Sequence, residues 1–181
     1  MAGKSKKVGI FAIHGSVAEH AAILEKLKIE PVKVRAADDL KDLDGLILPG
    51  GESTALSDLG HAYRLEQEIK KFAKSGMPLF GTCAGMILLV RWGLLDATIE
   101  RNAYGRQLHS FEADLKIPQL GKASFLGIFI RAPRIAKLGR HAEEIANFEG
   151  APVLVQQGNI WASSFHPELT DDTRIHNMIF T

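Results

Sequence analysis

The chain has a single cysteine, Cys83, and the residues around it give the strongest indication of chemistry in the sequence. It stands between Gly81 and Gly85, after one apolar run and before another at residues 86–90. This order predicts a strand, a tight turn and a buried helix, the arrangement called a nucleophile elbow. A helix N-terminus and a neighbouring base both favour the thiolate, which is the attacking form of cysteine. The alternative is a small buried apolar residue, because short glycine patterns also occur by chance.

A second candidate lies near the C-terminus, where His166, Pro167 and Glu168 follow a predicted strand. Residues two apart in an extended segment share a face, so the Glu168 carboxylate can reach one ring nitrogen of His166 while the other points away. A catalytic base needs such an orienting partner. The alternative for this segment is a surface His-Pro-Glu turn.

The third candidate is a pair of glycines, Gly50 and Gly51, that follows a predicted strand. Adjacent glycines leave the backbone free to turn N–H groups toward a ligand. Together with the N–H of Ala84, the residue after Cys83, they are predicted to form an oxyanion hole. Thiol, imidazole, carboxylate and backbone donors would then converge at one edge of a sheet.

The first half of the chain alternates between predicted strands and helices. Ser16 and Glu19 have the spacing of a capping box, which predicts a helix that starts here and ends at Leu27. The alternation predicts an α/β fold with a mainly parallel sheet, in which ligands bind beyond the C-terminal ends of the strands. The predicted strands span residues 8–13, 31–35 and 44–48, and a second helix spans residues 65–75.

The second half is predicted to add antiparallel strands to this sheet, because its apolar segments are separated by turn residues. These strands span residues 111–115, 125–130, 153–157 and 160–165, and a last helix starts near residue 170. No internal repeat or linker divides the sequence, so we expect one domain over residues 1–181.

Composition excludes several classes of function. The 181 residues are 46% hydrophobic and 24% charged, as in ordinary globular proteins, and 22 basic against 21 acidic residues give no indication of a nucleic-acid partner. No apolar run is long enough to cross a membrane, no leader is recognised, and one cysteine forms no internal disulfide, so we expect a cytoplasmic protein. The histidines other than His166 have no metal-site spacing and are expected to lie at the surface or in the core; they are residues 14, 20, 61, 109, 141 and 176.

Taken together, these segments resemble the class I, triad-type glutamine amidotransferases, which have a flavodoxin-like fold. Within that group they resemble the glutaminase subunits of pyridoxal 5′-phosphate synthase. The resemblance runs from Lys7 almost to the C-terminus, and residues 100–102 and 129–133 are specific to this subunit. The other segments that carry it are residues 48–54, 80–85, 104–107, 110–112 and 164–170.

The resemblance implies roles for individual residues. Cys83 would attack the side-chain amide of L-glutamine and form a glutamyl thioester, His166 would shuttle protons, and Glu168 would orient His166. The implied substrate-binding residues are Gly51, Glu52, Ser53, Arg101, Ile130 and Arg131. An arginine suits a free α-carboxylate because its guanidinium can donate two hydrogen bonds.

The resemblance also implies a partner. Ammonia would pass to a barrel-shaped synthase subunit docked near residues 14–20, and the chain itself would need neither a cofactor nor a metal. His14 stands where relatives usually have glutamine. A histidine can also donate a hydrogen bond, so we interpret the difference as a change in this donor and not as its loss. The chain is shorter than its relatives between Val90 and Leu94. Two alternatives stay open: a glutaminase that serves another synthase, and a non-catalytic protein with the same fold that uses Cys83 for redox sensing or binding.

Overall fold

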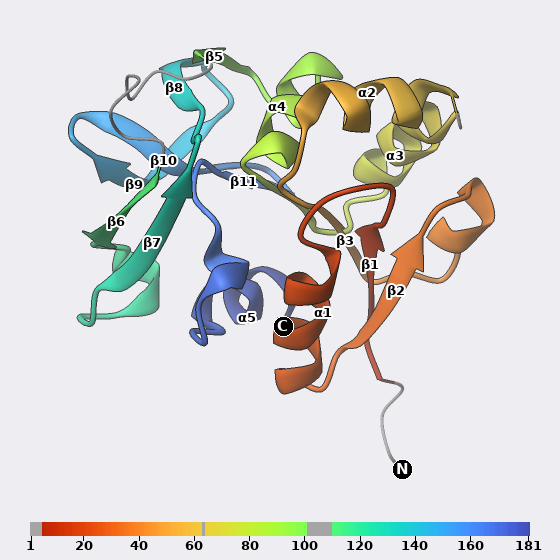
Figure 1. The fold of residues 1–181 in the computed structure, drawn as a ribbon, viewed down its shortest axis with the longest axis horizontal. Coiled ribbons are helices and arrows are strands. Elements are labelled where there is room, and N and C mark those ends of the chain that lie inside the picture. Colours follow the sequence, from red (N-terminus) through yellow and green to blue (C-terminus); the bar gives the residue numbers. More distant parts are fainter. Residues whose placement is uncertain (1–4, 63, 101–109) are drawn as a thin grey trace.

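The computed structural model describes residues 5–62, 64–100 and 110–181, and its centre is a seven-stranded sheet (Figure 1). Four neighbour pairs of this sheet are parallel, and the two pairs at one end are antiparallel. The predicted α/β fold with a mainly parallel sheet and added antiparallel strands is therefore confirmed. In spatial order the strands are β2 (Glu30–Val34), β1 (Lys7–Phe11), β3 (Gly45–Leu48), β4 (Leu79–Thr82), β11 (Ile160–Ser163), β10 (Ala151–Gln157) and β9 (Glu143–Phe148).

Helices cover both faces of the sheet (Figure 1). Successive residues of a strand point to opposite faces, and the core follows this rule: Ile47 packs in the cluster that contains residues of α1 and α5, while Leu46 and Leu48 pack in the cluster that contains residues of α2, α3 and α4. This two-sided burial explains why the central strands are continuous apolar runs. The helices are α1 (Val17–Lys26), α2 (Ser53–Ala62), α3 (Leu65–Lys74), α4 (Ala84–Arg91) and α5 (Arg174–Phe180).

Two small antiparallel pairs lie beside the antiparallel end of the sheet (Figure 1). One joins β6 (Ser110–Leu115) to β7 (Phe125–Ile130), and the other joins β5 (Ala97–Glu100) to β8 (Arg134–Leu138). The backbone N–H of His166 donates to the carbonyl of Ile128 in β7 at 2.8 Å. The β6–β7 pair is thereby fastened to the segment that follows β11. Short 3₁₀ turns complete the chain at η1 (Ala37–Leu40), η2 (Pro118–Leu120) and η3 (Pro167–Leu169).

The structure contains elements that the sequence did not predict, namely α2, β5, β8 and β9. β8 and β9 carry charged residues at exposed positions and depend on pairing with distant strands, which a local pattern does not record. The predicted strand at residues 160–165 ends at Ser163, and the last helix begins at Arg174 rather than near residue 170.

The predicted capping box at the start of α1 is wrong. Ser16 is the N-cap residue, but its side chain makes no bond to the helix. Its hydroxyl donates instead to Oε1 of Glu168 at 2.7 Å. The hydroxyl is therefore directed at a distant carboxylate and not at the N–H groups that begin the helix. In the part of the chain described here, no helix has both the length and the apolar character needed to span a membrane.

Candidate active site

Cys83 lies at the predicted elbow, between β4 and α4. Its backbone has φ 49° and ψ −102°, a region that side chains rarely adopt and that costs about 1–3 kcal/mol. The strain is held by close packing: a Cβ on Gly85 would overlap the carbonyl oxygen of Leu48, and a Cβ on Gly81 would lie 2.7 Å from the carbonyl carbon of Gly85. The two glycines thus let strand and helix approach closely enough to form the turn.

The sheet brings His166 beside Cys83. β4 and β11 are adjacent and parallel, with Thr82 paired to Ser163, so the residues that follow both strands leave the sheet at the same edge. The backbone N–H of Cys83 donates to the carbonyl of Ser163 at 2.8 Å, and its thiol lies near the carbonyl of Ile130 at 3.8 Å and close enough to His166 to raise the pKa of the imidazole. On the other side of the ring, Nδ1 of His166 lies 2.7 Å from Oε1 of Glu168. The three predicted triad side chains therefore lie together, with His166 bonded to Glu168 and next to Cys83.

Burial and charge set the protonation of this series. Burial disfavours the charged form of His166, but hydrogen bonds to Cys83 and Glu168 and their charges outweigh it and raise the pKa of His166 to about 10. Burial also acts against the Glu168 carboxylate, but His20, His166 and Ser16 outweigh it and lower the pKa of Glu168 to about 2. At neutral pH, Glu168 is thus ionised and His166 protonated.

Gly50 and Gly51 follow β3 and line the same cavity as Cys83. A Cβ on Gly50 would overlap Cε1 of His166, so the glycine provides the space that the imidazole occupies. The N–H of Gly50 donates to Oγ1 of Thr82 at 3.0 Å, and so is engaged within the protein. Ala84 is the first residue of α4, where N–H groups have no partner within the helix.

These elements enclose a cavity of about 660 Å³ that opens beside Cys83. Most of the predicted site residues line it: Gly50, Gly51, Glu52, Ser53, Cys83, Ala84, Ile130, Arg131 and His166. Glu168 is buried behind His166 and does not line the cavity, and Arg101 lies outside the described residues. Sequence reasoning therefore found most of the cavity wall.

Three lining residues have features that bear on ligand binding. Ser53 has a buried hydroxyl with no hydrogen-bond partner among the described residues. The Glu52 carboxylate accepts the N–H groups of Thr54 at 3.1 Å and Ala55 at 3.2 Å, and so caps α2. Arg131 has φ 44°, a second strained backbone beside the cavity.

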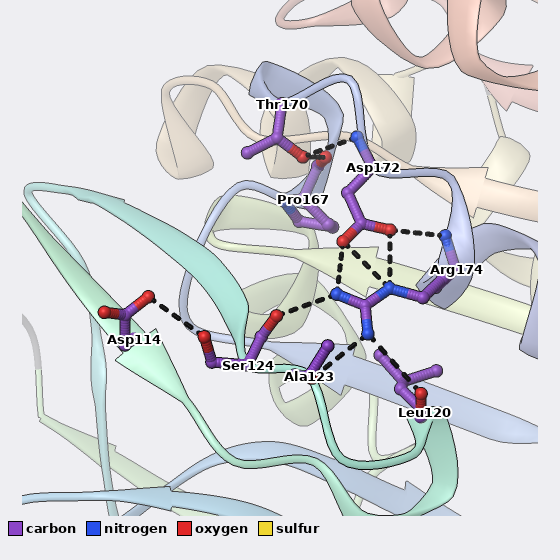
Figure 2. Close-up of polar contacts among 8 residues, drawn as sticks. All are labelled: Asp114, Leu120, Ala123, Ser124, Pro167, Thr170, Asp172 and Arg174. Carbon is purple, nitrogen blue, oxygen red and sulfur yellow. Dashed lines mark hydrogen bonds and ion pairs between the residues drawn. The ribbon is translucent and has the colours of Figure 1, made fainter.

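The segment after Glu168 is fixed by side chains that the sequence analysis did not single out (Figure 2). Arg174 pairs with Asp172 and donates to the carbonyls of Ala123 at 3.1 Å and Ser124 at 2.8 Å. Thr170 donates to the carbonyl of Pro167 at 3.1 Å. The His-Pro-Glu segment is thereby tied to the loop before β7.

The sequence analysis also missed Ser16, His20 and Thr82, which contact the triad or the Gly50 loop from behind. One signal was available, since Ser16 and His20 are four residues apart and so lie on one face of a helix. In the described ranges, no cluster of three or more His, Cys, Asp or Glu side chains is arranged to hold a metal ion.

Comparison with known families decides which proteins share this arrangement. The model of the SNO glutamine amidotransferase family matches residues 10–181. The chain belongs to this family. Members similar to it include the pyridoxal 5′-phosphate synthase subunits PdxT of Kosmotoga olearia, 48% identical with 94% of each chain covered, and of Moorella thermoacetica, 44% identical with 94% of this chain and 96% of the relative covered. The predicted family is therefore confirmed.

Solved structures agree with this assignment to the SNO family. A crystal structure of a glutamine amidotransferase superposes with a TM-score of 0.90 at 46% identity, covering 95% of this chain and 96% of that one. The structure of PurLQS from Thermotoga maritima superposes with a TM-score of 0.74 at 20% identity, covering 97% of both chains, and shows the shared fold alone. The chain is thus an SNO-family glutamine amidotransferase.

Proposed function

We propose that this chain is the glutaminase subunit of a pyridoxal 5′-phosphate synthase, which hydrolyses L-glutamine and delivers ammonia to the synthase subunit for vitamin B6 synthesis. The observation that carries the proposal is that Cys83 and His166 line one cavity of about 660 Å³, with His166 bonded to Glu168 behind it. Its relatives, which match it over nearly their whole length, are named as the PdxT subunit of that synthase.

The chemistry proposed for Cys83 and His166 occurs in two stages. The Cys83 thiolate attacks the side-chain amide carbon, and the carbonyl oxygen takes the displaced electron pair as an oxyanion. His166 gives its proton to the amide nitrogen, the C–N bond breaks, and ammonia leaves a glutamyl thioester. Water then attacks the thioester while His166 accepts its proton, and the C–S bond breaks to release glutamate and the Cys83 thiolate.

Backbone N–H groups are proposed to stabilise the oxyanion. Ala84 and Gly51 both line the cavity, and Ala84 begins a helix whose N-terminal N–H groups favour negative charge. Gly50 was predicted to donate as well, but Thr82 engages its N–H, so it joins the oxyanion hole only after a shift of its peptide. Until then we assign the hole to Ala84 and Gly51.

Glutamine itself is proposed to be held by the remaining predicted residues. The unpartnered hydroxyl of Ser53 suits a polar group of the substrate, and burial makes leaving it unpaired costly. Ile130, Arg131 and Glu52 also line the cavity, and Arg101 is proposed to bind the α-carboxylate. The residue set thus offers both apolar and charged contacts to an amino acid.

Residues 1–181 are proposed to act as a single glutamine amidotransferase domain that needs no cofactor of its own. Its partner is the barrel-shaped synthase subunit, which would dock near residues 14–20 at the mouth of the cavity, where Gly15 and Ser16 lie. We place the enzyme in the cytoplasm, because a reducing compartment keeps a thiol nucleophile active.

Glutamate release from L-glutamine tests the proposal, with and without a pyridoxal 5′-phosphate synthase subunit. We expect turnover that rises when the synthase is added and is absent from a Cys83→Ala variant with an unchanged melting temperature. Turnover that survives in Cys83→Ala would contradict the proposed nucleophile. Turnover stimulated only by a synthase of another pathway would contradict the partner, and none under any condition would favour a redox or binding role.

A further inference from the structure

His20 is a fully buried imidazole in α1, behind the active site rather than in its cavity. Its Nε2 lies 3.2 Å from Oγ1 of Thr82 and 3.6 Å from Oε1 of Glu168, and its Nδ1 lies 3.0 Å from Nε2 of His176. Both ring nitrogens are therefore engaged by groups from three other parts of the chain. None of this is needed to build α1, whose other buried residues are Ile23 and Leu24.

The surroundings keep His20 uncharged. Burial lowers the pKa of His20, outweighing the opposing effect of Glu168 and Glu19, and the charge of His166 lowers it further. Burial and the neighbouring His20 also lower the pKa of His176, to about 3. Two neutral imidazoles thus lie next to an ionised carboxylate at neutral pH.

The contacts select one tautomer of His20. With the proton on Nε2, the N–H faces Thr82 and the negative Glu168, and Nδ1 accepts from His176. With the proton on Nδ1, a lone pair would face the carboxylate, and Nδ1 of His176, which has no partner among the described residues, would become a buried unpaired donor. Buried unpaired donors are rarer than unpaired acceptors, so the Nε2–H form is favoured.

From this position His20 contacts two groups that support the site, Glu168 and Thr82. Oε1 of Glu168 also accepts a hydrogen bond from Ser16 and contacts Nδ1 of His166. Oγ1 of Thr82 accepts the N–H of Gly50, the residue packed against the His166 ring. One side chain thus connects the acid–base pair to the glycine loop.

We propose that His20 is a positioning residue, whose Nε2–H fixes the Glu168 carboxylate and the Thr82 hydroxyl and so holds His166 and the Gly50 loop in register with Cys83. This inference rests on the proposed glutaminase function. Because His20 does not line the cavity, its loss should lower kcat and leave the KM for glutamine nearly unchanged.

Two amide variants separate the two nitrogens of the ring. In His20→Asn the amide takes the place of Nδ1 and faces His176, while in His20→Gln it takes the place of Nε2 and faces Thr82 and Glu168. With synthase present, we expect kcat to fall about 10- to 100-fold in His20→Asn and to recover to within about threefold of wild type in His20→Gln, with KM within about twofold in both. Equal kcat in His20→Asn and wild type would overturn the proposal, as would equal losses in both variants.

A second readout needs no turnover. Cys83 is the only cysteine of the chain, so its alkylation by iodoacetamide reports on this thiol alone. We expect alkylation at pH 7 to be about tenfold slower in His20→Asn than in wild type and largely restored in His20→Gln, because a displaced Glu168 supports the imidazolium beside the thiolate less well. Identical rates in all three proteins would overturn the proposal.

Nitrogen-15 NMR of the histidine rings tests the wild-type protein directly, with the His20→Gln spectrum identifying the signal. We expect Nε2 of His20 to carry the proton and the ring to be neutral at pH 7; a proton on Nδ1, or a charged ring at that pH, would overturn the proposal even if the variants fail to fold. Wild-type protein that shows this tautomer and the alkylation pattern but no glutamine turnover would contradict the proposed function and leave the positioning role intact.

Discussion

Ser16 and Glu168 are joined by a hydrogen bond of 2.7 Å across 152 positions of sequence. Ser16 is the N-cap residue of α1, yet its hydroxyl serves the carboxylate that orients His166 instead of the helix. The start of α1 is therefore part of the active-site support. Since the synthase is proposed to dock near residues 14–20, docking and triad geometry would share this contact.

Replacing Ser16 with alanine should lower activity more than stability. Loss of one hydrogen bond to the Glu168 carboxylate, worth about 1 kcal/mol to the reaction, predicts a roughly fivefold fall in kcat. Steady-state glutaminase assays with synthase present measure this, and thermal unfolding checks the fold. Glu25→Gln, which removes an exposed carboxylate of α1 outside residues 14–20, is the matched control. A similar fall in kcat in Glu25→Gln would contradict the explanation.

Patterns that are local in sequence predicted the centre of this protein well. The strands β1 and β3 are buried on both faces and are marked by apolar runs, and Gly81 and Gly85 marked the elbow by their spacing from Cys83. The strand β9 was not predicted, because its buried and exposed residues do not alternate regularly and its register depends on β10. Sequence patterns do not record pairing between distant segments.

The residues that support the triad from behind were not predicted for the same reason. His166 and Glu168 could be paired from their spacing, since the contact is local. Ser16 was assigned to a cap and His20 to the surface or core, because their partners lie more than 60 residues away. A side chain that fits a local pattern can bind a distant partner instead, and the sequence does not show that partner.

Glu168→Gln should change the pH dependence of the protein. In wild type the folded-state pKa of His166 is about 10, above its usual value of 6.5, so its pairing stabilises the fold fully below pH 6.5 and is lost as pH rises through 10. Without the carboxylate the pKa of His166 falls, and the loss of stability moves to lower pH. Ring NMR titration of His166 and urea unfolding at pH 7 and pH 9 measure both effects.

Activity of Glu168→Gln should fall about 100-fold at pH 7, because an unsupported His166 is a poorer proton carrier. Glu143→Gln, which removes an exposed carboxylate of β9, is the control and should match wild type. If His166 titrates at the same pH in Glu168→Gln and in wild type, the carboxylate does not hold its proton.

Gly50→Ala should impair catalysis by displacing an imidazole. The new Cβ would overlap Cε1 of His166, and neither backbone is free to retreat, since the carbonyl of Gly50 accepts the N–H of Ser16 at 3.2 Å. We expect kcat to fall at least about tenfold, as for loss of an oriented base.

Gly76→Ala is the control: its φ of 85° strains an added Cβ, but nothing lies within 4 Å. It should lose about 1 kcal/mol of stability and keep its kcat. Equal kcat in Gly50→Ala and wild type would show that the His166 ring has room to move.

Arg174 should matter through the three carbonyls and the carboxylate that its guanidinium joins (Figure 2). Arg174→Ala is expected to lower the free energy of unfolding by about 1 kcal/mol, because three carbonyls of the loop before β7 lose a charged donor. Arg174→Lys should recover little of this, since an ammonium keeps the charge but not the planar fork.

Lys26→Ala, which removes the exposed ion pair with Asp171, is the control and should leave stability unchanged. Urea unfolding gives the free energies, and hydrogen exchange over residues 118–124 should speed up in both Arg174 variants; full stability in Arg174→Lys would mean that charge alone holds the loop.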